Sequence, residues 1–420
     1  MNTISASIIT IGDELLIGQV IDTNSAWMAQ ALNKIGIPVH RRIAVGDKWD
    51  EIWQALDQES ALSTLIFITG GLGPTSDDIT KPLLCKYFGG KLVLHQPTLQ
   101  HVEYLFEHVF KRGLPLSERN IKQAEVPDNC TILKNELGTA PGMLFEKNGC
   151  LFFSLPGVPH EMQGLMQNEI IPLLQQRFTL GSIEHRTLLT AGIGESMLAE
   201  RLVEFEKSLP KNLSLAYLPN YGMVRLRLTL NGENATEVNA TINTYFENLK
   251  ALVADVVITD KDEPLEAVVG RILLEQKKTI GTAESCTGGY ISHLITSIPG
   301  SSSYYEGSII SYSYYIKEKV LHVNKQTLEK YGAVSEEVVR EMVQNAQEML
   351  HTDYAIAVSG IMGPGGATPD KPVGTVWMAV SGNHKIITKK MHFRFNRQRN
   401  IQLTAANALL LLIQLMNDKN

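Results

Sequence analysis

The stretch Ala283-Glu284-Ser285-Cys286-Thr287-Gly288-Gly289 begins at the end of a predicted strand, residues 279–283. Its two glycines let the backbone bend and approach a ligand closely before a helix begins. Amide groups at the start of such a helix favour a phosphate or an oxyanion. Strand, hydroxyl-rich turn and helix together predict an α/β domain with a ligand site at the end of the strand.

The sequence around this stretch predicts the remaining elements of the same domain. An acidic segment at 260–263 ends in Pro264 and indicates a linker, and apolar residues then recur at one-face helical spacing. Further strands are expected at 354–359 and 375–381, and Ser335 is the expected cap of a helix. The apolar residues 405–416 are too few to span a bilayer, so we expect a packed terminal helix.

Two more glycine-rich segments lie in this part of the chain. They are Ser359-Gly360-Ile361-Met362-Gly363-Pro364-Gly365-Gly366 and Lys371-Pro372-Val373-Gly374-Thr375-Val376. One such loop is as readily a tight turn as a ligand site. Three of them within about 160 residues favour a binding site.

Serine attack on an amide requires a base, and no histidine lies near Ser285. A lysine can serve if burial or a cationic neighbour lowers its pKa to about 7–8. Lys317 is the candidate, although spacing alone does not show that it reaches Ser285. Cys286 is the stronger intrinsic nucleophile, but a small cysteine beside a strand end is typical of buried packing. Thr287 is expected to cap the next helix, and Glu284 either orients the site or makes a structural hydrogen bond.

Together, the AESCTGG, SGI-x-GP-x-GG and KPVGTV strings closely resemble the C-terminal domain of the competence/damage-inducible CinA family, which includes stand-alone nicotinamide-nucleotide amidases. The resemblance implies metal-free hydrolysis of nicotinamide mononucleotide to nicotinic acid mononucleotide and ammonia. It implies Ser285 as nucleophile, Lys317 as general base and Tyr312 as a supporting group. The expected substrate-binding residues are Glu284, Thr287, Gly288, Gly289, Ser359, Gly360, Gly363, Gly365, Gly366 and Arg397.

One segment departs from the family pattern. Members commonly carry glycine-aspartate-arginine, with another arginine four residues later, whereas this chain reads Phe395-Asn396-Arg397 with Ile401 at the later position. Arg397 is still expected to contact the substrate phosphate, with Arg399 or Arg394 assisting.

The first 170 residues alternate strand and helix patterns. Strands are expected at 7–11, 39–45 and 64–69, with amphipathic helices between them, which indicates a parallel sheet covered on both faces. The loop at 70–78 leaves the end of a strand, where open α/β sheets bind ligands. Carboxylates beside its glycines suit a divalent cation that bridges phosphates. Asp13, Asp22 and Asp47 are equally explained as helix caps or turn residues.

The strings Gly12-Asp13-Glu14-Leu15-Leu16, Asp22-Thr23-Asn24-Ser25, Val45-Gly46-Asp47 and Thr69-Gly70-Gly71-Leu72-Gly73-Pro74-Thr75-Ser76-Asp77-Asp78 resemble the molybdopterin-binding domain of molybdenum-cofactor proteins and of the N-terminal half of the CinA family. The match extends to Gly138-Thr139-Ala140-Pro141-Gly142 and to the residues around Pro156. It implies a pyrophosphatase that acts on ADP-ribose with cobalt or magnesium. The expected metal or phosphate residues are Asp13, Asp77, Asp78 and Glu161, and the expected nucleotide-binding residues are Gly70, Gly71, Gly73, Thr75, Asn120 and Gln123.

The middle of the chain, from about 186 to 260, predicts a β-α-β-β-α-β order, typical of a small split βαβ module. It shows no catalytic constellation, and a spacer or dimerisation role is expected. The predicted organisation is therefore three-part: a three-layer molybdopterin-binding-like domain at 1–172, a small α+β module at 173–260, and a second α/β domain, the amidase, at 261–420.

Composition restricts the functional classes. A net charge of −6 argues against direct binding of nucleic acid. The four cysteines form no CxxC pair, and the N-terminus shows no signal-peptide pattern, so a cytoplasmic protein without membrane attachment is expected. A homodimer is expected as well. Two alternatives stay open: a protein that binds a pterin or nucleotide without turnover, and an interaction protein of DNA uptake or repair.

Overall fold

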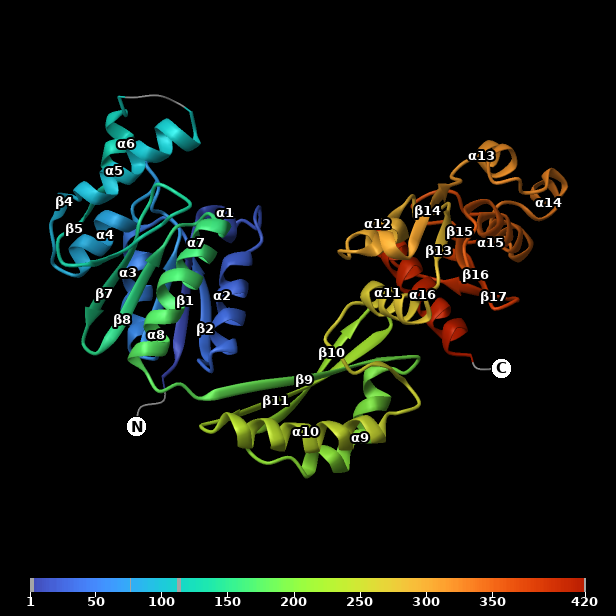
Figure 1. Ribbon diagram of the computed structural model, residues 1–420, viewed down its shortest axis with the longest axis horizontal. Coiled ribbons are helices and arrows are strands. Elements are labelled where there is room, and N and C mark those ends of the chain that lie inside the picture. Colours follow the sequence, from blue (N-terminus) through green and yellow to red (C-terminus); the bar gives the residue numbers. More distant parts are fainter. Residues whose placement is uncertain (1–3, 76, 112–114, 419–420) are drawn as a thin grey trace. The chain divides into compact units, whose positions relative to one another are not determined.

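The computed structural model describes residues 4–75, 77–111 and 115–418. The protein has a mixed α/β fold with three main sheets of six, four and five strands (Figure 1). The chain packs as two compact units, one with residues 1–185 and one with 248–420, and the middle sheet is divided between them.

The N-terminal sheet has the order β2-β1-β3-β8-β7-β6. Strands β1 (Ala6–Ile11), β2 (Val39–Val45), β3 (Leu65–Thr69) and β8 (Cys150–Leu155) run parallel. Strands β7 (Gly142–Lys147) and β6 (Thr131–Leu133) are antiparallel, so the expectation of a wholly parallel sheet is wrong at this edge. The reason is a two-residue hairpin at Asn148 and Gly149, both with positive φ, which forces β7 and β8 to run in opposite directions.

Helices cover both faces of this sheet (Figure 1). On one face, α2 (Thr23–Lys34), α7 (Pro159–Leu165) and α8 (Ile171–Arg177) pack on Ile8, Phe67 and Phe153. On the other, α3 (Trp49–Ser60) and α4 (Thr80–Tyr87) pack on the alternate strand residues, such as Ile9 and Ile68. Because successive strand residues point to opposite faces, two buried cores result, and the three-layer prediction is confirmed.

The middle sheet has the order β10-β11-β9-β12 and the predicted β-α-β-β-α-β sequence of elements. Along β11, Val224, Leu226, Leu228 and Leu230 are all buried, as the alternation predicts. Its elements are β9 (Ser182–Ala191), α9 (Glu195–Lys207), β10 (Leu213–Asn220), β11 (Met223–Gly232), α10 (Ala235–Leu252) and β12 (Val257–Thr259).

The C-terminal sheet has the order β14-β13-β15-β16-β17. Strands β14 (Tyr305–Ile310), β13 (Ile280–Glu284) and β15 (Tyr354–Gly360) are parallel, whereas β16 (Thr375–Gly382) and β17 (Lys385–His392) are antiparallel. Helix α15 (Glu336–Leu350), capped by Ser335 as predicted, packs on one face. The other face is covered by α11 (Leu265–Gln276), α12 (Tyr290–Thr296) and α16 (Arg397–Asn417).

Helix α16 is the packed terminal helix that the sequence predicts, with twelve buried residues. Within the described residues, no helix combines the length and apolar character needed to cross a membrane. The remaining elements are α1 (Asp13–Leu16), β4 (Leu92–Leu94), α5 (Gln96–Tyr104), α6 (Glu118–Lys122), β5 (Glu125–Pro127), α13 (Tyr314–Lys319), α14 (Lys325–Tyr331), π-helical turns at Leu105–Val109 and Met166–Ile170, and a 3-10 turn at Ser301–Ser303.

Candidate active site

Ser285 and Lys317 meet at the carboxyl end of the C-terminal sheet. Ser285 directly follows β13, and its backbone N–H donates to the carbonyl of Val358 in the neighbouring strand β15. Lys317 lies in α13, whose first turn is capped by the Ser313 side chain. Lys317 Nζ lies 2.7 Å from Ser285 Oγ and donates to the carbonyl oxygen of Ser311 at 2.6 Å. The fold therefore supplies the contact that spacing could not show.

Burial suits the Lys317 amine to act as a base, in addition to its position beside Ser285. Lys317 is 1% exposed, and no carboxylate among the described residues pairs with its amine. Removal from water disfavours the charged ammonium and lowers the pKa of Lys317 to about 8, an effect that the nearby Cys286 only partly opposes. A lysine with this pKa is substantially neutral at mildly alkaline pH and can accept the serine proton.

A cavity of about 250 Å³ opens over this pair. Most of the predicted binding residues line it, including Arg397 and the glycines of the 359–366 loop. In that loop Gly363 has φ +86°, and a side chain there would meet Val373 at 2.6 Å, so the loop requires glycine. The residues that line the cavity are Ser285, Cys286, Tyr312, Lys317, Ala333, Val334, Ser359, Gly360, Ile361, Met362, Gly363, Gly365, Gly366 and Arg397.

Four predicted binding residues stand outside the lining of this cavity: Glu284, Thr287, Gly288 and Gly289. The Thr287 hydroxyl donates to the Glu284 carboxylate at 2.6 Å, so the expectation that it caps α12 is wrong. The residue at the cap position is Gly289, and the Glu284 carboxylate accepts the helix N–H groups instead. A carboxylate five residues before the cap position of a helix has no sequence signature of a cap, which is why the pattern favoured Thr287.

The Cys286 side chain is 6% exposed, and burial raises the pKa of its thiol to about 12. A thiol that stays protonated near neutral pH is a poor nucleophile. We therefore expect Cys286→Ala to retain a kcat close to wild type, with a loss of about 1 kcal/mol in unfolding free energy from the lost packing. Steady-state amide hydrolysis and thermal unfolding measure the two effects. Loss of turnover in the folded variant would instead identify Cys286 as the nucleophile.

Arg397 and Tyr312 form one side of the cavity. Arg397 donates to the carbonyl oxygen of Gly363 at 2.8 Å and to the Tyr312 hydroxyl at 3.0 Å. The Arg397 guanidinium is thereby fixed at the rim despite the departure of the surrounding segment from the family pattern. The neighbouring Arg399 backbone N–H donates to the Asn396 side chain, which caps α16.

The N-terminal loop after β3 is organised by Asp78. Its carboxylate accepts from the backbone N–H groups of Gly73 at 2.8 Å and Thr75 at 2.9 Å. Gly71 has φ +64°, and a side chain there would meet the Thr80 hydroxyl at 2.2 Å. Asn24, in another of the family-like strings, donates to the carbonyl oxygen of Gly157 at 2.7 Å. The fold thus brings distant quoted strings to one end of the sheet.

The four carboxylates predicted to hold metal do not converge. Among residues 4–75, 77–111 and 115–418, no group of three His, Cys, Asp or Glu side chains is arranged to hold an ion. Both Asp78 oxygens already accept from the loop, and Glu161 accepts from Asn135 at 2.6 Å. These residues do not fit a single metal site.

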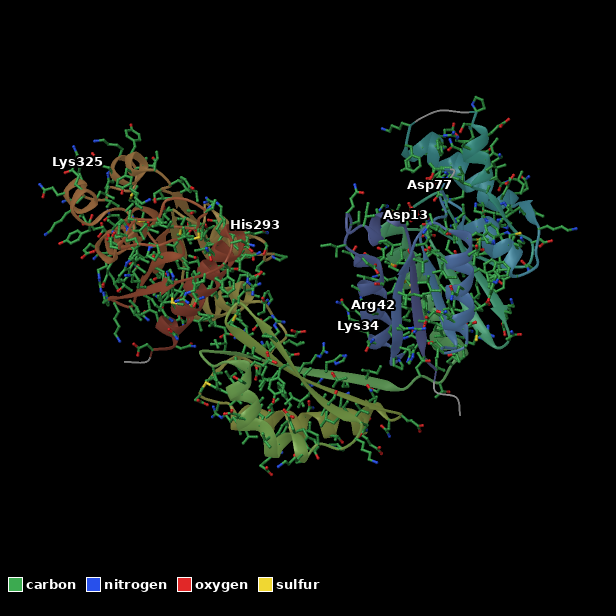
Figure 2. All side chains as sticks on the ribbon, turned by 180° about the vertical axis from the view of Figure 1, so that it is seen from behind. Asp13, Lys34, Arg42, Asp77, His293 and Lys325 are labelled. Carbon is green, nitrogen blue, oxygen red and sulfur yellow. The ribbon has the colours of Figure 1, made fainter. Side chains whose placement is uncertain are left out.

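Asp13 and Asp77 nevertheless lie at the same end of the domain (Figure 2). Asp13 and Asp47 exchange hydrogen bonds, each carboxylate accepting the backbone N–H of the other residue. The pKa of Asp47 is raised, first by burial and then by the negative charges of Asp13, Glu14 and Asp77.

Lys81 is a buried lysine that the sequence analysis did not identify. It hydrogen-bonds to the end of helix α6 (Glu118–Lys122), where the predicted nucleotide-binding residues lie. Asn120 lies in α6 and Gln123 directly follows it. The Lys81 amine donates to the carbonyl oxygens of Lys122 at 3.3 Å and Gln123 at 3.0 Å, and burial lowers the pKa of Lys81 to about 8. A lysine in a helix of mixed polarity carries no sequence signal for such burial.

The comparisons with known proteins agree with the sequence motifs. Residues 7–176 match the family described as a probable molybdopterin-binding domain, 185–258 the damage-inducible protein CinA KH domain, and 262–416 the CinA C-terminal domain. A CinA-like protein of Cytophaga hutchinsonii is 45% identical over 98% of both chains, and one of Flavobacterium psychrophilum is 44% identical over 96% of both.

Among solved structures, competence damage-inducible protein A (ComA) of Klebsiella pneumoniae is 33% identical and covers 37% of this chain and 97% of its own, with a TM-score of 0.36. The full-length relatives confirm the resemblance inferred from the motifs: this chain belongs to the CinA family.

Proposed function

We propose that the C-terminal domain hydrolyses the carboxamide of nicotinamide mononucleotide by acyl transfer to Ser285. The observation that carries the proposal is the buried contact of 2.7 Å between Lys317 Nζ and Ser285 Oγ. A neutral lysine amine keeps two N–H groups and one lone pair. It can therefore donate to the Ser311 carbonyl oxygen while its lone pair accepts the proton of Ser285.

The first half of the reaction forms an ester. Ser285 Oγ attacks the amide carbon as its proton passes to Lys317, and a tetrahedral intermediate forms. The Lys317 ammonium then protonates the amide nitrogen, the C–N bond breaks, and ammonia leaves. In the second half, Lys317 takes a proton from water, the hydroxide attacks the ester, and Ser285 recovers its proton as nicotinic acid mononucleotide departs.

The cavity has features that suit a mononucleotide. A glycine-rich backbone allows a sugar or phosphate to approach closely, and Arg397 presents a fixed guanidinium at the rim. These features support Arg397 as the phosphate contact.

Product analysis tests the proposal. Purified protein incubated with nicotinamide mononucleotide and EDTA is expected to release equal amounts of ammonia and nicotinic acid mononucleotide. Folded protein that yields neither product would contradict it. Ammonia release that depends on an added divalent ion would contradict the lysine-only mechanism.

For the N-terminal domain, ADP-ribose hydrolysis to AMP and ribose 5-phosphate stays a prediction of the resemblance. Two observations support this prediction. The Asp78 carboxylate orders the loop after β3, and several acidic side chains lie near Asp47 at the same end of the sheet. We expect AMP to be released from ADP-ribose and its release to fall in Asp77→Asn. The requirement for magnesium or cobalt stays a prediction of the resemblance, and loss of AMP on addition of EDTA tests it. Asp77 is solvent-exposed, so that variant should fold. Saturable ADP-ribose binding without AMP would favour the binding-protein alternative.

A homodimer and a cytoplasmic location likewise stay predictions.

A further inference from the structure

The carboxylate of Glu284, the residue directly before the proposed nucleophile, is completely buried. A buried charge is costly unless it is fully hydrogen-bonded. Five donors from the following turn and helix satisfy this one: Thr287 Oγ1 at 2.6 Å, Gly289 N at 3.0 Å, Ile291 N at 3.1 Å, Ser292 N at 2.8 Å and Ser292 Oγ at 2.9 Å. Both oxygens therefore face the start of α12, whereas the cavity is lined by other residues.

Hydrogen bonds from Glu284, through its carboxylate and its backbone carbonyl, also lead to β14, the strand that precedes the lysine helix α13. Ser292 Oγ lies 2.9 Å from the Glu284 carboxylate and 2.6 Å from the hydroxyl of Tyr305, in β14. The Glu284 carbonyl oxygen also accepts from the backbone N–H of Ser311, just after β14. Ser311 is the residue whose own carbonyl oxygen accepts from Lys317. A continuous set of hydrogen bonds thus runs from the serine turn to the lysine.

We propose that Glu284 is a positioning residue for the amide hydrolysis: its carboxylate holds the turn at 285–289 so that Ser285 Oγ stays at hydrogen-bond distance from Lys317 Nζ. The inference rests on the proposed function, because it takes Ser285 as the nucleophile. Glu284 contacts neither substrate nor the transferred proton, since the turn and helix donors occupy both of its oxygens. Its loss therefore affects turnover and not substrate affinity.

Glu284→Gln tests this role, because in either orientation the amide places its N–H donors against at least one backbone N–H donor of the turn or of α12. We expect kcat for nicotinamide mononucleotide to fall about 100-fold, the cost of a nucleophile displaced by about 1 Å, with KM little changed. The rate at which phenylmethanesulfonyl fluoride modifies Ser285, followed by peptide mass, should fall in parallel.

The chain offers a matched control at the other end of β13. The Asp353 carboxylate accepts from Thr279 N at 2.9 Å and Thr279 Oγ1 at 3.2 Å, and it pairs with Lys278. Asp353→Asn also places an amide against a backbone donor, but far along the strand from the serine. We expect it to lower the melting temperature and leave kcat and the Ser285 modification rate unchanged.

The outcomes separate the two proposals. Wild-type kcat and modification rate in Glu284→Gln would show that Glu284 only stabilises the fold and overturn the positioning role. Wild-type protein that neither releases ammonia nor reacts at Ser285 would instead overturn the proposed function. If Glu284→Gln does not fold, Thr287→Ala takes its place: it removes the carboxylate's side-chain contact with the turn, and an unchanged kcat and Ser285 modification rate there would overturn the inference.

Discussion

Replacing Ser285 by alanine should abolish hydrolysis of nicotinamide mononucleotide, with kcat falling by about 10⁴-fold or more. The reason is that no other described side chain in the cavity combines a nucleophilic atom with contact to Lys317. Loss of a catalytic serine removes the covalent route entirely, leaving only binding and electrostatic stabilisation. Ammonia release over time measures the effect.

Ser297→Ala is the matched control for this variant. Its hydroxyl donates to the carbonyl oxygen of Leu294 at the far end of α12, so activity should be retained. If Ser285→Ala kept more than a few per cent of wild-type turnover, water would have to attack the amide directly.

Replacing Lys317 by methionine is expected to lower kcat by about 10²–10⁴-fold, the usual contribution of a general base. Methionine approximates the lysine stem in length and suits the buried position, so the variant should fold. Lys319→Met, an exposed position on the same helix, should leave turnover unchanged.

The pH dependence of kcat/KM tests whether Lys317 acts as a base. With the pKa of Lys317 lowered to about 8, the neutral base is depleted below that pH and fully present above it. In wild-type protein kcat/KM should therefore rise about tenfold per pH unit up to about pH 8 and then level off. Lys317→Met should lack this transition. A wild-type midpoint near the ordinary lysine pKa would show that burial does not tune this amine.

Much of the fold follows from periodicity, because alternation along β11 and one-face spacing in α2 or α11 directly reflect burial. The strands β14 and β17 were missed because their residues are largely half-exposed, so they lack a clear apolar pattern. The hairpin between β7 and β8 reverses the direction of the chain, which makes β7 antiparallel to β8. An alternation of strand and helix patterns does not show such a reversal.

The sequence identified Ser285 and Lys317 only as candidates, because their contact joins two elements through the parallel pairing of β13 with β14. For a related reason, the sequence did not show that Glu284 and Thr287 lie outside the lining of the cavity and hydrogen-bond to each other. Residue type and spacing do not show whether a polar side chain next to a nucleophile points to the ligand or back into the protein. Here five local donors decide the orientation of Glu284.

The most direct test of acyl transfer is the partition of products in hydroxylamine. An ester on Ser285 should be intercepted to give the hydroxamate of nicotinic acid mononucleotide, which should form with wild-type protein and be absent with Ser285→Ala. Ammonia release without any hydroxamate, at hydroxylamine concentrations that intercept ordinary serine esters, would show that water attacks the amide directly and would contradict Ser285 as the nucleophile.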